Sequence, residues 1–184
     1  MPQGDGSNRG NGNTVSVINS GVIATHGIGA IGIVARSIGG GGGLNVANGN
    51  AGRSGSGGNV TVTNNGIINT LGNYAHGIFA QSAGGKGSGG DVDINIGGAV
   101  GVQGFGSNGI YAQSTGAAGN GNISVTIALN GGVFCLSESS TAVSFVGGND
   151  NLLDNYGLIE SAGQAVSSTD GANTTSRLLK NSLI

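Results

Sequence analysis

The sequence predicts an all-β protein, a right-handed parallel β-helix (β-solenoid) of about five to six coils with variable Gly/Asn-rich loops. A unit of about 23 residues recurs along the chain, which is typical of solenoids. Each copy opens with alternating apolar and polar residues in which β-branched types dominate, a pattern that indicates strands buried on one face. The spacers between copies differ in length, as they can only where they loop outside the regular structure.

Four copies of the repeat align, starting at Thr14, Val60, Val92 and, more loosely, Ile123. Positions that share a residue type across the first three copies are Val15, Val60 and Val92; Gly21, Gly66 and Gly98; Gly32, Gly77 and Gly109; and Ala35, Ala80 and Ala112. Stacked coils bring equivalent residues together, whereas a hairpin-built sandwich needs no such matching. The alignment therefore favours the solenoid over an antiparallel sandwich.

The repeats divide the chain into a Gly/Asn-rich leader or truncated loop at 1–13 and a single solenoid domain at 14–184. The coils are expected near 14–37, 60–82, 92–114, 123–145 and 151–168, with a partial coil at 177–184. The partial coil is expected because "NLLDNYGLI" from Asn151 returns as "RLLKNSLI" from Arg177, roughly 26 residues later. Neighbouring coils should lie about 4.8 Å apart, with Val, Ile and Ala directed into a dry core.

Asparagine and glycine mark the predicted corners. Asn19, Asn64 and Asn155 each precede a glycine by two positions. Because Asn and Gly tolerate positive φ, we expect this conformation at these corners.

The stretch "HGIGAIGIVARSIGGGGG" contains Gly27-x-Gly29-x-x-Gly32, the spelling of a dinucleotide-binding fingerprint. That site requires a helix after the glycines and an acidic residue about 20 positions later. The run of five glycines would end a helix, and the following window "LNVANGNAGRSGSGG" contains no Asp or Glu. The second copy has Tyr74 at the equivalent of Gly29, so we interpret Gly29 as incidental and expect no cofactor.

Composition excludes several functions. The 184 residues include 42 Gly, and the six Lys and Arg are scattered, which argues against a nucleic-acid partner. No apolar run approaches the 18 or so residues of a membrane span, and the N-terminus lacks a signal-peptide pattern, so we expect no direct membrane insertion by this chain. Cys135 stands alone and is expected to be buried and inert. His26 and His76 occupy different repeat positions and are interpreted as ordinary turn residues.

The units "GIFAQSAGG", "GIYAQSTG" and "GIVARSIGGGGG", with their Gly-Asn spacers and "VTVTNNG"-like strands, resemble the repetitive passenger regions of bacterial autotransporter proteins. The later unit "GGNDNLLDNYGLIES" is similar to those passengers too, so the resemblance covers most of Thr14 to Ile184. It implies a segment of a larger exported protein, displayed at the cell surface as an outer-membrane adhesin-like stalk. Implied partners are host or cell-surface glycans or proteins, or further copies that associate through solenoid ends or faces. The family's export signal and membrane barrel are not found in this sequence, so we read the chain as a fragment of such a passenger.

Two other functions are weighed against this reading. A polysaccharide lyase or hydrolase on this fold needs clustered carboxylates, often with calcium. Asp91 and Asp93 share a strand face and are weak candidates for a cation, but the repeat places Asp93 beside Thr61 and Ser124, so we expect no metal site and no enzyme. An ice- or surface-binding face needs regular Thr-x-Thr rows, and only Thr61-Val62-Thr63 fits.

One surface feature is predicted as a binding site. Strand alternation directs Ile33, Ile78, Ile110 and Val143 inward, and Val34, Phe79, Tyr111 and Ser144 outward. Phe79 over Tyr111, beside Gln81, Gln113 and Arg36, would form an exposed aromatic-polar stripe. Such a patch can bind glycans or a second copy, unless a glycine-rich spacer covers it.

Overall fold

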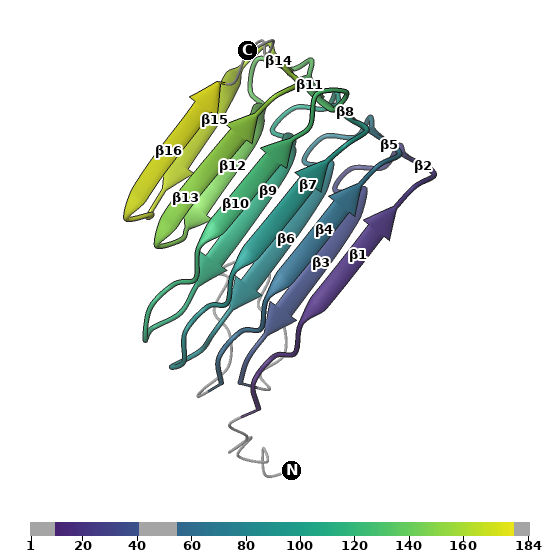
Figure 1. Ribbon diagram of the computed structural model, residues 1–184. Coiled ribbons are helices and arrows are strands. Elements are labelled where there is room, and N and C mark those ends of the chain that lie inside the picture. Colours follow the sequence, from purple (N-terminus) through teal and green to yellow (C-terminus); the bar gives the residue numbers. More distant parts are fainter. Residues whose placement is uncertain (1–9, 41–54, 179–184) are drawn as a thin grey trace, which may run out of the picture.

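The computed structural model describes residues 10–40 and 55–178, which form a right-handed parallel β-helix (Figure 1). Sixteen strands and no helix occur in this part of the chain. The strands are β1 (Val15–Asn19), β2 (Val22–Thr25), β3 (Ile33–Ile38), β4 (Val60–Asn64), β5 (Ile67–Thr70), β6 (Ile78–Ala83), β7 (Val92–Ile96), β8 (Ala99–Val102), β9 (Asn108–Thr115), β10 (Ile123–Ile127), β11 (Gly132–Cys135), β12 (Thr141–Gly147), β13 (Asp150–Asn155), β14 (Leu158–Ser161), β15 (Gln164–Thr169) and β16 (Asn173–Leu178).

Three consecutive strands make one coil, and equivalent strands of successive coils build three parallel sheets. Sheet A has the order β1-β4-β7-β10-β13-β16, sheet B β2-β5-β8-β11-β14, and sheet C β3-β6-β9-β12-β15. In Figure 1 the chain runs along sheet A in front, returns along sheet C behind, and advances by one strand at each circuit. The predicted fold class is confirmed.

The register of the first four coils is the one that the repeats predict. Val15 pairs with Val60 and Val60 with Val92, and Ile123 continues this column in the fourth coil. The inward residues of all three sheets form one apolar core, in which Val60, Ile68 and Ile78 are completely buried. Stacked aliphatic columns of this kind supply most of the burial that stabilises a solenoid.

The register predicted for the last coil is wrong. Asn151 pairs with Thr174, which lies 23 residues later, and not with Arg177. Strand β16 therefore begins at Asn173, and Arg177 lies beside Asp154, with 2.5 Å between Arg177 Nε and Asp154 Oδ1. The repeated Leu-Leu letters suggested the other alignment, but the short turn after β15 and the polar cross-strand pairs determine the register. Residues 179–184 of the predicted partial coil lie outside the described residues.

The corner glycines are required by close backbone approach and not by positive φ. Gly66 and Gly98 are not among the described residues with positive φ. A Cβ on Gly66 would overlap the carbonyl oxygen of Gly21, and one on Gly98 would overlap that of Gly66. Glycine is the residue that lets two backbones come this close.

The asparagines before these glycines also differ from the prediction, because none of them has positive φ. Asn19 Oδ1 accepts a hydrogen bond from the backbone N–H of Gly21 at 3.1 Å, and Asn155 Oδ1 does the same for Gly157 at 3.0 Å. Asn19 Nδ2 donates to Asn64 Oδ1 in the next coil at 2.8 Å. These side chains hold the corner together through hydrogen bonds.

Gly29 is not incidental, which corrects a second expectation. The equivalent residues Gly29, Tyr74 and Gly106 all adopt left-handed backbone conformations, with φ of 67°, 55° and 64°. Gly32 serves a different purpose, since a Cβ there would meet Ile68 and the carbonyl of Gly77. The Gly-x-Gly-x-x-Gly pattern therefore contains one glycine in a left-handed turn, Gly29, and one required by close packing between coils, Gly32.

A row of Asn and Asp side chains crosses the coils just before sheet A. The side-chain oxygen of Asn59 accepts the backbone N–H of Asp91 at 3.0 Å, and Asp91 Oδ1 accepts that of Asn122 at 2.8 Å. Asn122 Oδ1 accepts the N–H of Asp150 at 3.2 Å, and Asn173 Nδ2 donates to Asp150 Oδ1 at 2.8 Å. Each coil thereby fixes the start of the next strand of sheet A.

Asp91→Ala should lower the free energy of unfolding by about 1 kcal/mol, the usual net value of one lost hydrogen bond. Asp91→Asn keeps an acceptor oxygen for the N–H of Asn122 and should be nearly neutral. Urea denaturation of both variants checks this, and equal losses of stability would contradict the assigned role of Asp91.

Candidate functional site

The predicted stripe lies on the outer face of sheet C, over three coils. Val34 pairs with Phe79 and Phe79 with Tyr111, and the same strands place Arg36 beside Gln81 and Gln81 beside Gln113. The inward residues Ile33, Ile78, Ile110 and Val143 are buried beneath this face. Packing of these aliphatic side chains in the core holds strands β3, β6 and β9 rigid under the stripe.

The aromatic rings stack on one another. The ring centroids of Phe79 and Tyr111 are 5.1 Å apart, with an angle of 8° between the planes. His76, in the turn before β6, stacks on Tyr111 at 5.5 Å and on Phe79 at 6.3 Å. The guanidinium carbon of Arg36 lies 5.3 Å from the Phe79 centroid, within cation–π range. The faces of Phe79 are therefore occupied by protein groups, and a ligand would meet ring edges and polar termini.

A polar row runs beside the rings. Arg36 Nε donates to Gln81 Oε1 at 2.7 Å, and Gln81 Nε2 donates to Gln113 Oε1 at 2.5 Å. Only 1% of Gln81 is exposed, so the prediction of an exposed Gln81 is wrong: its two neighbours enclose it. Ser144 was also expected to face outward, yet only 7% of it is exposed because it lies between Tyr111 and Ser167 in adjacent coils.

Burial dominates the electrostatics of the stripe. Desolvation lowers the pKa of Arg36 and raises the pKa of Tyr111. It lowers the pKa of His76, whose Nδ1 accepts the backbone N–H of Asn108 at 2.9 Å and is thus held in the neutral form. The sequence analysis missed His76 as part of this cluster. Its position three residues before Phe79, in the turn that precedes the strand, could have indicated that His76 lies close to the aromatic rings.

We expect stability to fall at low pH through His76. Its pKa is lower in the folded protein than in the unfolded chain, so the unfolded chain binds more protons and stability is lost as pH falls below about 6.5. His76→Gln keeps an acceptor for Asn108 and should flatten the dependence of the urea midpoint between pH 7.5 and 5. Parallel profiles of wild type and variant would contradict the assignment.

The acidic candidates Asp91 and Asp93 lie on neighbouring positions at the start of β7. Asp93 is exposed beside Thr61 and Ser124, and desolvation, then the charge of Asp91, raises its pKa. Asp91 Oδ1 already accepts a hydrogen bond from the backbone N–H of Asn122. Within residues 10–40 and 55–178, no three His, Cys, Asp or Glu side chains are grouped as metal ligands would be. Cys135 is buried as predicted, and burial raises its pKa to about 11.

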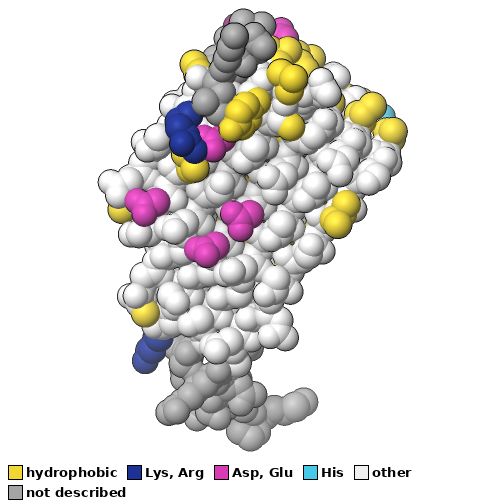
Figure 2. Space-filling model, viewed as in Figure 1, with side chains coloured by type: hydrophobic (Ala, Val, Ile, Leu, Met, Phe, Trp, Pro, Cys, Tyr) yellow, Lys and Arg dark blue, Asp and Glu magenta, His cyan; other side chains and the backbone are white. Residues whose placement is uncertain are grey.

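Sheet A presents a polar but irregular outer face. One of its two outward columns consists of Ser16, Thr61, Asp93, Ser124, Leu152 and Thr175. Figure 2 shows this face, with a few acidic side chains among uncharged ones. Threonine occurs at two places in this column, Thr61 and Thr175, which are separated by three other residues.

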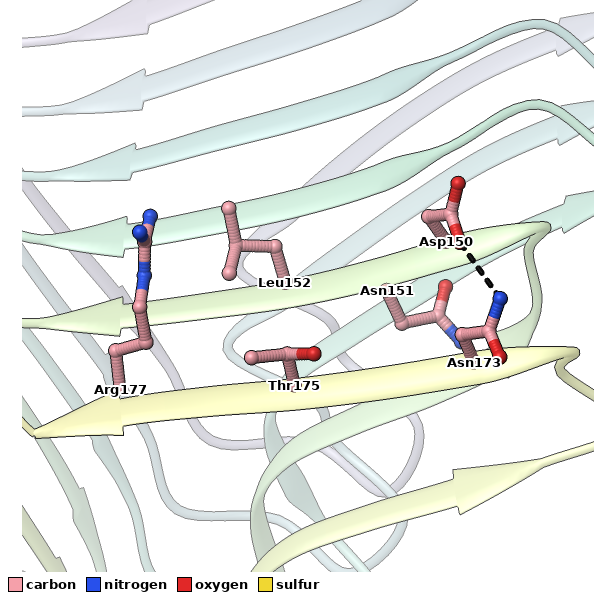
Figure 3. A pocket seen from close by; sticks show the side chains of 6 residues that line it. All are labelled: Asp150, Asn151, Leu152, Asn173, Thr175 and Arg177. Atoms are coloured by element: carbon pink, nitrogen blue, oxygen red, sulfur yellow. Dashed lines mark hydrogen bonds between the residues drawn. The ribbon is translucent and has the colours of Figure 1, made fainter.

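A hollow of about 300 Å³ lies at the C-terminal end of this face, between β13 and β16 (Figure 3). It is lined by Asp150, Asn151, Leu152, Asn173, Thr175 and Arg177. Asn173 is bonded to Asp150, and Arg177 makes two hydrogen bonds to Asp154. These charged and amide groups are thus engaged with one another across the two strands and stabilise the pairing of β16.

Comparison with known proteins gives no family assignment: no family model, no curated protein and no solved structure matches the chain. Among the described residues there is also no helix with the length and apolar character of a membrane span.

Proposed function

We propose that this β-helix is a stalk segment of a surface-displayed, autotransporter-like passenger that supports adhesion or self-association and has no enzymatic role. The observation that carries the proposal is the aromatic-polar stripe on sheet C, which continues over adjacent coils and is held by its own hydrogen bonds. A preorganised surface loses little side-chain entropy on binding.

The stripe offers hydrogen-bonding groups of the kind that recognise glycans and polar protein surfaces. Gln113 uses its carbonyl oxygen for Gln81, and its amide N–H groups remain as donors. Arg36 uses Nε for Gln81, and its two terminal nitrogens carry further N–H groups. Together with the Tyr111 hydroxyl, these donors suit hydroxyl- and carboxylate-bearing sugars.

Export as an unfolded chain fits the composition. One cysteine allows no intramolecular disulfide, and each coil needs only its neighbour to fold, so folding can proceed coil by coil after export. The flanking reading frame tests this part of the proposal. An export signal and a membrane barrel there would support it, and their absence from the complete gene would contradict it.

The adhesion role is tested with Phe79→Ser/Tyr111→Ser. This double variant should abolish binding to glycan arrays or host cells, because it removes the Phe79–Tyr111 stack over which Arg36 lies and the Tyr111 hydroxyl. Val34→Ser is the matched control, since Val34 lies in the same column and is 54% exposed but belongs to no ring stack. Urea denaturation reports stability in parallel. Unchanged binding by a stably folded double variant would rule out the stripe as the adhesive surface.

A further inference from the structure

The row of Asn and Asp side chains at the start of sheet A contains a covalent-modification motif. This motif, the sequon, is Asn-x-Ser/Thr with any residue but proline at x, and it is the acceptor of N-linked sugars. The chain has 22 asparagines, but only three begin a sequon: Asn59-Val60-Thr61, Asn122-Ile123-Ser124 and Asn173-Thr174-Thr175. All three asparagines are members of the row, in the second, fourth and sixth coils. The fold thus gathers into one line three motifs that are far apart in the sequence.

The two sequon positions change together from coil to coil. In the third and fifth coils the row has Asp91 and Asp150, and the residues two positions later are Asp93 and Leu152. These coils therefore lack both the acceptor amide and the hydroxyl, whereas the second, fourth and sixth coils have both. Successive coils are about 4.8 Å apart, so neighbouring sequons are about 10 Å apart. This spacing leaves one free coil between neighbouring sugars.

Strand alternation turns each sequon outward. Val60 is completely buried in the core, whereas Asn59, just before β4, is exposed and Thr61 lies on the outer face of sheet A. Residues 122–124 repeat this arrangement in the fourth coil. Figure 3 shows the first and third residues of the last sequon, Asn173 and Thr175, projecting from the same side of β16. Side chains two residues apart on a strand are about 7 Å apart, so an enzyme that approaches sheet A can reach the amide and the hydroxyl of one sequon together.

The acceptor nitrogens are available. Asn59 and Asn122 are exposed, and the Oδ1 atom of each accepts a backbone N–H of the next coil. In the part of the chain that the structure describes, Nδ2 of neither residue makes a hydrogen bond. Nδ2 of Asn173 donates one hydrogen bond to Asp150 Oδ1 and has a second N–H. An N-linked sugar replaces one N–H and leaves the carbonyl oxygen in place, so the row can keep its hydrogen bonds after modification.

The composition gives such sugars a physical role. The chain has only six Lys and Arg and eight Asp and Glu, and its net charge of −2 provides little electrostatic repulsion between copies. The outer face of sheet A is polar and largely uncharged (Figure 2). Sugars are bulky and solubilising, so a line of them along this face would keep copies apart there and leave sheet C accessible.

We infer that this row is an N-glycosylation site, with Asn59, Asn122 and Asn173 as acceptors for a transferase that uses an activated sugar. In the donor, C1 of the sugar is linked to a diphosphate. Nδ2 forms a bond to C1 while the bond between C1 and the diphosphate oxygen breaks. The diphosphate leaves with the electron pair of that bond, and the amide loses one proton to a base of the transferase. The inference goes beyond the proposed function, because it assigns a modification to sheet A and does not depend on the stripe of sheet C.

Mass spectrometry of the full chain isolated from its source cells tests the proposal. Peptides that contain Asn59 and Asn122 should carry the added mass of one or more sugar residues, which electron-transfer fragmentation assigns to the asparagine. Thr61→Val should abolish the modification of Asn59 and leave that of Asn122 unchanged, because valine suits the strand but has no hydroxyl. Thr61→Ser keeps a hydroxyl and should keep the sugar. Thr63→Val is the matched control, since Thr63 lies on the same face of β4 but belongs to no sequon.

A chain in which Asn59 and Asn122 are both unmodified would overturn the proposal, as would a sugar on Asn59 that Thr61→Val leaves unchanged. A sugar linked to the hydroxyl of Thr61, with Asn59 unmodified, would also overturn it by making the row an O-linked site. Labelling in cell extract with and without its membranes separates a lipid-linked donor from a nucleotide-linked one, and transfer from either supports the assignment. The adhesion variants lie on sheet C and these variants on sheet A, so failure of the adhesive role and failure of the glycosylation site are read separately.

Discussion

Replacing Gly66 with alanine should lower the free energy of unfolding by about 3 kcal/mol, a value at the upper end for overpacking. The added Cβ would overlap the backbone of Gly21 in the preceding coil, and neither backbone can move away without breaking the strand pairs on both sides of the corner. Since the clash separates the first coil from the second, amide hydrogen exchange should show protection lost in β1 to β3 while β7 to β12 remain protected.

Gly21→Ala is the matched control, because Gly21 holds the same position in the first coil. A Cβ there would meet only Asn19 Oδ1, at 3.9 Å. The variant should be neutral or more stable by about 0.4–1 kcal/mol, since alanine restricts the unfolded chain. Equal destabilisation by Gly21→Ala and Gly66→Ala would show that coil stacking is not what requires glycine at the corner.

Phe145→Ala should cost about 3–5 kcal/mol, the usual range for deletion of a buried aromatic side chain. Phe145 is completely buried in β12 and occupies the column that Ala35, Ala80 and Ala112 fill in the first three coils. The cavity would lie in the middle of the core, where rigid strands on three sides prevent collapse. Urea denaturation measures the loss.

Phe134→Ala serves as the comparison, because Phe134 lies on the outer face of sheet B in the same coil. Its removal should cost about 1 kcal/mol or less, as its half-buried ring lies outside the core, next to Gly132. Similar losses from the two variants would contradict the assignment of inward and outward faces.

The sequence was sufficient to predict the coils because stacking requires the same residue type at the same place in every turn. Val15, Val60 and Val92 revealed the register directly, and the alternation around them revealed the inward face. The last coil was misaligned because its inward positions are polar, with Thr174 and Ser176 where earlier coils have aliphatic residues. Without that apolar column to guide the alignment, the two leucines before Lys180 were aligned with the two leucines of the preceding repeat, Leu152 and Leu153.

The reasons for individual glycines were not predictable from one sequence. Positive φ and close backbone approach both favour glycine, so the sequence alone does not distinguish the role of Gly29 from that of Gly66. The structure separates them: Gly29 has φ of 67° and open space around it, whereas Gly66 lies against the preceding coil. The row from Asn59 to Asn173 was missed for a similar reason, since its members follow spacers of different lengths.

The stripe illustrates the same limit at the candidate site. Alternation and register placed Phe79 and Tyr111 side by side, and the structure has their rings stacked. Alternation assigns only a face, and it cannot show that Arg36 and Gln113 enclose Gln81 or that a turn carries His76 onto the rings. Those contacts depend on side-chain length and turn geometry.

Electron spin resonance distances along one column of sheet A test the stacked solenoid most directly. Spin labels at Thr61→Cys combined with Ser124→Cys, Leu152→Cys or Thr175→Cys probe separations of two, three and four coils. The native Cys135 should stay unlabelled, because it is buried and its pKa is raised to about 11. The account predicts backbone separations of about 10, 14 and 19 Å, increasing by about 4.8 Å with each coil. Distances that do not increase with the number of coils would contradict it.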